Sequence, residues 1–184
     1  MHTQSILIFL GLACLGVTVE AATIGPIVNP NNGHSYYVED AFNTWADAQA
    51  NAQALGGNLV TINDASENAW ILANLLTSSA TYWIGLSDAD VEGTFVWKTG
   101  EPLLFSNWAP GEPDDDFAVG GSGDYVFMNG STGEWLDTNG SFAGFVSGSI
   151  IEVAAVPVPA AGWLFGTGLA GLAGRGWLRR KCRR

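Results

Sequence analysis

Carboxylate side chains gather in one stretch of the sequence, where together they could bind a cation. The segment 88–124 contains one lysine and no arginine, and its acids include Asp88, Asp90, Glu92, Glu112, Asp114, Asp115, Asp116 and Asp124. Glycine and proline residues fold this segment back on itself, so the carboxylates repel one another when they come close. Calcium removes that repulsion, because it binds about six to eight oxygens from carboxylates, carbonyls and water. The pattern therefore favours a calcium site over a solvated acidic loop.

Soft metal ligands and thiol nucleophiles are scarce between the two ends of the chain. The cysteines are Cys14 and Cys182, and the histidines are His2 and His34. The segment 22–174 therefore forms no internal disulfide, and its one histidine excludes Cys/His nucleophilic sites and histidine-rich zinc cages. Oxygen ligands remain, and they suit calcium better than zinc or copper.

Charge is separated along the chain. Six of the seven lysine and arginine residues lie in the segment 175–184, and all 18 acids precede it. Without Glu20, the segment 22–174 carries 17 carboxylates against Lys98 alone, a net charge of about −16. Binding to nucleic acid requires clustered lysine and arginine, so we exclude a nucleic-acid partner and expect cations instead.

The beginning of the chain has the features of a signal peptide. Residues 5–19 form an apolar run, and Val19 and Ala21 provide the small residues that a signal peptidase reads. We predict a signal peptide over 1–21. A lipoprotein signal with Cys14 as the lipidated residue is the alternative.

The end of the chain has the features of a membrane segment with a sorting motif. Residues 153–174 carry no charge and precede the basic block, which predicts a transmembrane helix with its basic end in the cytoplasm. The run Val156, Pro157, Val158, Pro159, Ala160, with the apolar helix and arginine-rich end after it, resembles the PEP-CTERM sorting signal of Gram-negative bacteria. The resemblance implies export, a transient anchor in the inner membrane and cleavage by an exosortase. An ordinary single-pass tail anchor is the alternative.

Two helices and then a strand-rich half must position the acids. A strand is predicted over 34–38, a helix begins at Thr44 and ends at Gly56, and a second helix follows Asp64, because each helix start has the spacing of a capping box. Short strands are predicted over 82–86, 95–97, 125–128 and 149–153. An α+β domain with a long irregular region over 87–124 follows from this order, and loops of that length are usually functional.

Four landmarks in this order resemble the C-type lectin domain over residues 33–154. They are Leu55-Gly56-Gly57-Asn58-Leu59 with Glu67 after it, Trp83-Ile84-Gly85-Leu86, Asn107-Trp108-Ala109-Pro110-Gly111-Glu112-Pro113-Asp114, and Trp135-Leu136-Asp137. The resemblance implies a C-type lectin-like α+β fold, with two helices and short antiparallel strands around a long calcium-binding loop region. Ala52 and Tyr125 stand where the family usually has half-cystines, so we expect stability to come from a tryptophan-rich core and from bound metal.

The resemblance also implies two calcium sites in the long loop. The auxiliary site would use Asp88, Glu92, Asp115 and Asp124, which are all acidic. The primary site, which contacts sugar, would use Glu112, Asp114 and Asp137, with a cis peptide at Pro113. This primary site is incomplete, because Gly123 stands where a ligating glutamate is expected and Leu136 replaces an asparagine. Asp116 or a water molecule would have to substitute.

A further calcium site and a group of tryptophans complete the expectations from the resemblance. Some family members bind calcium beside the second helix, where this chain offers the Thr61 carbonyl, Glu67 and Glu152; Glu67 is equally explained as a helix cap. We expect Trp108 to pack beneath the loop, with a sugar-stacking platform as the alternative, and expect Trp45, Trp70, Trp83 and Trp97 in the core.

Three classes of function remain open on the sequence. The leading hypothesis is an exported calcium-dependent protein that binds carbohydrate or exopolysaccharide at the cell surface or in the matrix, with a signal peptide (1–21), a lectin-like domain (22–154) and a sorting signal (155–184). The alternative is a structural or protein-binding matrix component in which calcium only holds the fold. A glycoside hydrolase needs just a pair of carboxylates, but every plausible pair is assigned to metal, so we predict that the protein is not an enzyme.

Overall fold

The computed structural model describes residues 22–76, 80–115, 122–140 and 146–155. The predicted signal peptide, the sorting motif at 156–160 with the helix and basic block after it, and Asp116 lie outside these residues. Within the described ranges, no helix has the length and apolar character needed to cross a bilayer.

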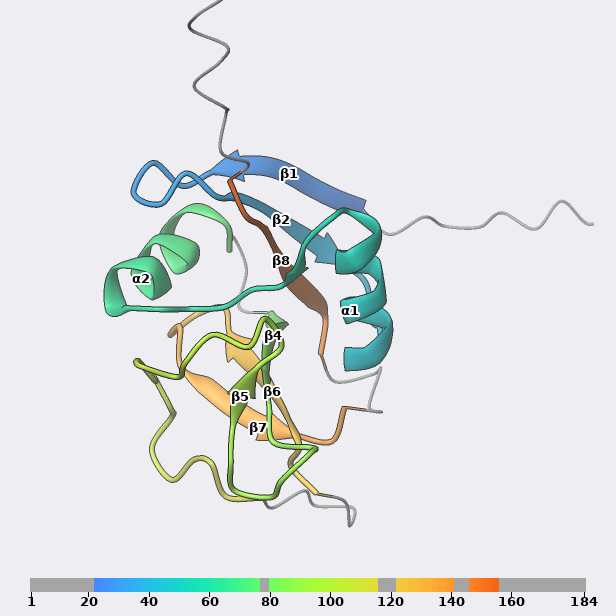
Figure 1. Cartoon of the computed structure of the whole chain (residues 1–184), viewed down its shortest axis with the longest axis vertical. Helices are drawn as coiled ribbons and strands as arrows, with labels where there is room; N and C mark the ends of the chain where they lie inside the picture. The colour runs from blue at the N-terminus through green and yellow to red at the C-terminus, as the bar shows by residue number, and fades with distance from the viewer. Residues whose placement is uncertain (1–21, 77–79, 116–121, 141–145, 156–184) are drawn as a thin grey trace, which may run out of the picture.

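Eight strands of the described ranges form one sheet, and the two helices lie on opposite sides of strand β8 in the view of Figure 1. Neighbouring strands follow the order β1-β2-β8-β4-β6-β7, with β3 beside β8 and β5 beside β4. The strands are β1 (Ala22–Val28), β2 (Ser35–Asp40), β3 (Asn58–Leu59), β4 (Thr81–Ser87), β5 (Val96–Trp97), β6 (Tyr125–Asn129), β7 (Trp135–Thr138) and β8 (Gly148–Val153). The α+β class is as predicted. The strands pair antiparallel, as predicted, with one exception: β4 and β8 are parallel.

Both helices begin where the sequence predicts. Helix α1 (Trp45–Ala54) has Thr44 as its N-cap, whose hydroxyl accepts a hydrogen bond from the Asp47 amide. Helix α2 (Ala65–Asn74) has Asp64 as its N-cap, whose carboxylate accepts from the amides of Ser66 and Glu67. These caps satisfy amides that the first turn leaves without partners.

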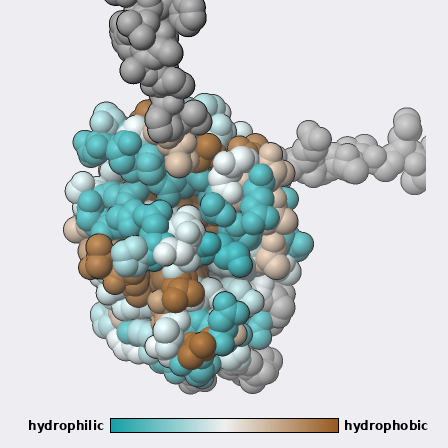
Figure 2. Space-filling view, in the orientation of Figure 1, coloured by the Kyte–Doolittle hydropathy of each residue, from teal (hydrophilic) through white to brown (hydrophobic). Residues whose placement is uncertain are grey.

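Tryptophan side chains form much of the core, as predicted, although Trp70 is only partly buried against it. The surface seen in Figure 2 is mainly hydrophilic. Trp83, Trp97 and Trp135 are almost completely buried, and Trp45 is 6% exposed. The ring of Trp135 makes edge contacts with Trp97, Phe105 and Trp108, at centroid distances between 5.6 and 6.0 Å. These contacts fasten the long loop to β7, and Trp108 packs against the core beneath the loop.

Aromatic packing takes the position of a family half-cystine at Tyr125. The Tyr125 ring lies 4.9 Å from the Trp45 ring. A Cβ on Gly140 would come within 2.3 Å of Tyr125 Cδ2, so the ring packs directly against the Gly140 backbone. The contact joins α1, β6 and the end of β7 without a covalent bond.

Candidate functional site

Three carboxylates meet between the long loop and β7. Glu112 and Asp114 flank Pro113 in the loop, and Asp137 lies in β7. The Glu112–Pro113 peptide bond is cis. One carboxylate oxygen from each acid lies within 4.8 Å of the other two. We call these residues the Glu112 cluster, and they are the three acids that the resemblance assigns to the primary site.

Glu112 is the most perturbed acid of this cluster. Its Oε2 atom is buried, and within the described residues it has no hydrogen-bond partner. Burial, a hydrogen bond with the Asp137 carboxyl and the nearby charges of Asp137 and Asp114 raise the pKa of Glu112 to about 7. A buried carboxylate oxygen without a donor is costly to leave unpaired, and a cation in its place would supply the missing interaction.

Asp137 also fixes the backbone of the loop. Its Oδ1 accepts a hydrogen bond from the Asp114 amide at 3.3 Å and its Oδ2 accepts from the Asp115 amide at 3.1 Å. Asp115 adopts a positive φ of 52°, and its Oδ1 accepts from the Gly123 amide at 2.6 Å. The loop is therefore tied to β7 by hydrogen bonds from its own backbone.

Gly123 is packed against the Glu112 cluster. A Cβ at this position would lie 2.4 Å from Asp137 Oδ2 and 3.2 Å from Asp115 Cα. A side chain cannot be added here unless Asp137 or the loop moves. The position where the resemblance expects a ligating glutamate thus has no room for one.

The four acids of the auxiliary set are less closely grouped than the Glu112 cluster. Asp88 is 3% exposed, its Oδ2 accepts from the Gly93 amide, and its Oδ1 is buried without a hydrogen-bond partner in the described part of the chain. The backbone amide of Asp88 donates to the Asp124 carbonyl at 3.1 Å, so the two residues are neighbours. Loss of hydration and the charges of Asp115 and Asp88 raise the pKa of Glu92. The Glu112 cluster is the tight carboxylate group found in the described ranges.

The proposed further calcium site beside α2 is filled by hydrogen-bond donors from the protein itself. Tyr36 donates its hydroxyl to Glu67 Oε1 at 2.5 Å and lies 3.1 Å from Glu152 Oε1. Glu152 Oε2 accepts from the Thr61 amide. His34 Nδ1 lies 2.5 Å from Glu152 Oε1, and Asn32 donates to Glu67 Oε1. Both carboxylates are satisfied without metal.

Glu67 differs in detail from the predicted helix cap. Its Oε2 accepts from the Asn63 amide, which precedes the N-cap residue Asp64, whereas a capping box would use the amide of the N-cap itself. Burial raises the pKa of Glu67, and burial together with the nearby charge of Glu152 raises the pKa of Tyr36.

Sequence reasoning missed Tyr36, His34 and Asn32 as partners of these acids. Tyr36 faces Glu152 because β2 and β8 pair in the register that joins these two residues. No local sequence pattern indicates that β2 pairs with β8, so the contact between Tyr36 and Glu152 could not be predicted from the sequence. Strands β1, β3 and β7 were also missed. Strand β3 has only two residues, and β7 has only four and follows a turn.

Comparison with known proteins places these observations in a family. Residues 42–142 match the family described as Lectin C-type domain. The chain is 39% identical over 103 residues to the low affinity immunoglobulin epsilon Fc receptor of Mus musculus, a match that covers 55% of this chain and 29% of the receptor. It is 38% identical over 104 residues to pulmonary surfactant-associated protein D of Bos taurus, which covers 55% of this chain and 27% of that protein. The chain therefore spans less than a third of the length of these relatives.

Solved structures show the same fold. The cow C-type carbohydrate-recognition domain of CD23, crystallised in the presence of a GlcNAc2Man3 oligosaccharide, has a TM-score of 0.58 and 34% identity, covering 67% of this chain and 89% of that one. The carbohydrate-recognition domain of the human scavenger receptor C-type lectin has a TM-score of 0.60 and 26% identity, covering 69% of this chain and 95% of that one.

Proposed function

The chain belongs to the C-type lectin domain family, and from this premise we propose that it binds carbohydrate in a calcium-dependent manner through the Glu112 cluster. Its similarity to a carbohydrate-recognition domain crystallised with an oligosaccharide supports the choice of ligand class. The family consists of lectin domains, which argues against the glycoside hydrolase that the paired carboxylates alone would permit.

One observation carries this proposal. Glu112 has a buried carboxylate oxygen without a partner in the described residues, and oxygens of Asp114 and Asp137 lie within 4.8 Å of its carboxylate. Three carboxylates held this close repel one another, and burial of Glu112 together with the nearby charges of Asp137 and Asp114 raises the pKa of Glu112. A donor set made only of carboxylate oxygens is hard and anionic, which suits calcium.

The three acids would have distinct roles around a bound ion. Calcium held by Glu112, Asp114 and Asp137 would offer its open coordination positions to vicinal sugar hydroxyls. An ionised Asp114 can only accept hydrogen bonds from those hydroxyls, whereas the asparagine of other family members can also donate. Glu112-Pro113-Asp114 matches neither the mannose-type nor the galactose-type motif, so a monosaccharide preference does not transfer to this chain.

A second function is favoured by the crowding at Gly123. The predicted fourth ligand is missing there, and a Cβ would lie 2.4 Å from Asp137 Oδ2. A site with too few ligands would bind calcium weakly and would not hold a sugar. Calcium would then serve mainly to stabilise the fold. In that case the protein is a structural or protein-binding matrix component, and calcium at Asp88, Glu92, Asp115 and Asp124 acts as a staple.

We also propose the route by which the protein reaches its place of action. The sequence supports a bacterial protein with a signal peptide (1–21), a lectin-like domain (22–154) and a PEP-CTERM sorting signal (155–184). Signal peptidase and an exosortase would act on the two ends, and the inner membrane would hold the chain between these steps. The lectin-like domain would then act at the cell surface or in the exopolysaccharide matrix.

A glycan array probed with and without calcium tests the proposed function. We expect binding to at least one glycan class in calcium and its loss in chelator. Glu112→Gln keeps the shape of the side chain but removes a ligand charge, so it should abolish that binding. Glu101→Gln, at an exposed acid outside the cluster, is the matched control and should bind like the wild type.

The array also distinguishes the two functions. If the wild type binds no glycan in calcium while calcium still raises its melting temperature, the structural or protein-binding function is the better description. If Glu112→Gln binds glycans as well as the wild type does, the Glu112 cluster is not the sugar site.

A further inference from the structure

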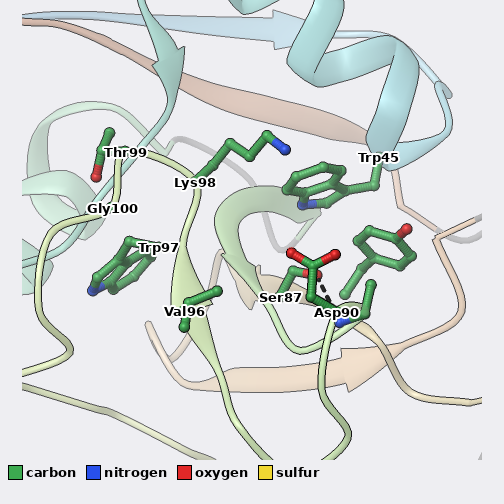
Figure 3. Close-up of a pocket in the computed structure, with 10 residues that line it drawn as sticks. Trp45, Ser87, Asp90, Val96, Trp97, Lys98, Thr99 and Gly100 are labelled. Carbon is green, nitrogen blue, oxygen red and sulfur yellow. Dashed lines mark hydrogen bonds between the residues drawn. The ribbon is translucent and has the colours of Figure 1, made fainter.

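A hollow of about 350 Å³ lies between the start of α1, the end of β4 and strand β5, and it contains no member of the Glu112 cluster. We call it the Lys98 pocket. Figure 3 shows the side chains that line it, which come from four separate parts of the chain. The lining residues used below are Trp45, Ser87, Asp90, Lys98 and Tyr125.

The walls of the Lys98 pocket are held in place by the fold. The Trp45 indole donates a hydrogen bond from Nε1 to the Ile84 carbonyl at 2.8 Å, which fixes the orientation of its ring. The Tyr125 ring lies 4.9 Å from Trp45 and is backed by Gly140. Ser87 pairs with Tyr125 on one side and with Val96 on the other in the sheet. A ligand would therefore meet preformed walls, which reduces the cost of ordering them on binding.

Three polar groups converge on this space. Figure 3 shows the Lys98 ammonium and the Asp90 carboxylate directed toward the Trp45 ring. The Lys98 Nζ atom lies 5.9 Å from the centre of that ring. Across the described ranges, neither Lys98 nor Asp90 forms an ion pair. Ser87 Oγ accepts from the Ala89 amide, which leaves its hydroxyl hydrogen to donate.

We propose that the Lys98 pocket is a second saccharide site, which binds one neutral pyranose ring without calcium. Lys98 donates to sugar hydroxyls, Asp90 accepts from them, and Ser87 does both. The half-buried Tyr125 ring offers aromatic carbon to the apolar face of the sugar, and Trp45, which is 6% exposed, supports it from behind. The volume lies at the lower end of the range for small-molecule sites, which fits one ring and not a long oligosaccharide.

The charge of the domain selects a neutral ligand. Lys98 is the one base among 17 carboxylates in the segment 22–174. An anionic sugar would approach against that negative potential, and its attraction to a single exposed ammonium is small. The hydroxyl groups of a neutral sugar are not repelled by the negative potential. They can accept a hydrogen bond from Lys98 and donate one to Asp90.

Chemical-shift mapping in chelator tests this site separately from the calcium site. The full-length chain, labelled with ¹⁵N and kept in excess EDTA, is titrated with the methyl pyranosides of glucose, mannose and galactose. About 10 mM sugar fills most of a site whose Kd is about 1 mM. We expect saturable shifts at the backbone amides of Asp90, Lys98 and Gly100 and at the Trp45 indole N–H with at least one of the three sugars.

Two variants and one control give the proposal its test. Lys98→Gln and Asp90→Asn change exposed side chains, so they should fold normally and weaken binding about tenfold each. Asp40→Asn, an exposed acid outside the pocket, should bind like the wild type. Absence of saturable shifts, or equal affinity in both pocket variants and the wild type, would overturn the proposal. Tighter binding of glucuronate than of the neutral glucoside would overturn the assignment of a neutral ligand.

The proposals for the two sites can be overturned independently of each other. The calcium-dependent function fails if glycan binding on the array is unaffected by chelator, and this result leaves the titration in EDTA interpretable. The Lys98 pocket proposal fails if the titration in EDTA shows no shifts there, whatever the array shows in calcium.

Discussion

Glu112→Gln should stabilise the calcium-free domain at neutral and alkaline pH, although the same change should destroy its proposed calcium site. In the folded protein, burial, the hydrogen bond with Asp137 and the charges of Asp137 and Asp114 raise the pKa of Glu112 from 4.5 to about 7. The ionised form is therefore disfavoured by folding. Glutamine has nearly the same shape and carries no charge, so it avoids this cost.

The sign and size of this effect on stability follow from the linkage between proton binding at Glu112 and folding. Between pH 4.5 and about 7 the folded state holds the Glu112 proton and the unfolded state does not. The contribution of this group to stability is thus fully present below pH 4.5 and is lost as the pH rises through 7. The shift corresponds to at most about 3 kcal/mol, and because Glu112 is only partly buried, solvent screening reduces it to about 1 kcal/mol.

Thermal melting in chelator measures this effect. The variant should melt about 4 °C above the wild type near pH 8, and the two proteins should melt together near pH 4. Glu101→Gln controls for the loss of one surface charge and should follow the wild type at both pH values. An advantage of Glu112→Gln that is the same at both pH values would refute the reasoning, because it would not come from ionisation of Glu112.

Four further predictions test other parts of the structure. Calcium at about 100 times its Kd should stabilise the protein by about 2.7 kcal/mol and raise its melting temperature by several degrees. An unchanged melting temperature would contradict calcium binding. Loss of the shift in Asp88→Ala or Asp124→Ala would assign the ion to the auxiliary residues. Tyr36→Phe removes a donor from Glu67 and Glu152, so a urea titration should show a loss of about 1–3 kcal/mol, while Tyr37→Phe should cost far less. Gly140→Ala places a methyl group against the Tyr125 ring and should cost about 1–3 kcal/mol in the same titration; a cost near zero would mean that the ring is free to move. Mass spectrometry of the mature protein from its native host should find no peptide beyond the proline motif, and Pro157→Ala should leave membrane-bound precursor. A peptide containing Trp177 in the surface fraction would argue against cleavage of the sorting signal.

Local sequence signals predicted the elements whose formation depends on local chemistry. Thr44 and Asp64 cap helices because their side chains reach the first free amides of the same chain segment. Strand β1 gave no comparable signal, because it lies at the edge of the sheet with an exposed surface and contains Pro26. Its place is set by pairing with β2. The parallel pairing of β4 with β8 likewise depends on a long-range contact that no spacing encodes.

The candidate site was predictable in its residues but not in its geometry. The resemblance to the C-type lectin domain assigned Glu112, Asp114 and Asp137 to one site, and the structure brings them together. The closeness of Gly123 to Asp137 depends on how the loop returns to β6, which is a property of the tertiary fold. The Lys98 pocket was missed for the same reason, since its lining residues come from α1, β4, β5, β6 and the loops after β4 and β5, and share no motif.

Two acidic groups with similar composition in the sequence differ in whether every buried carboxylate oxygen has a hydrogen-bond donor, and this difference favours metal binding at one of them. Glu67 and Glu152 are buried or half-buried, but Tyr36, Asn32, His34 and two backbone amides supply their hydrogen bonds. A cation there would have to displace donors that are already in place. The carboxylate of Glu112 has Asp137 and Asp114 as its close neighbours and retains a buried oxygen without a donor in the described residues. Calcium at the Glu112 cluster would replace repulsion by coordination, whereas calcium beside α2 would only exchange one satisfied arrangement for another, so we expect the ion to bind in the loop.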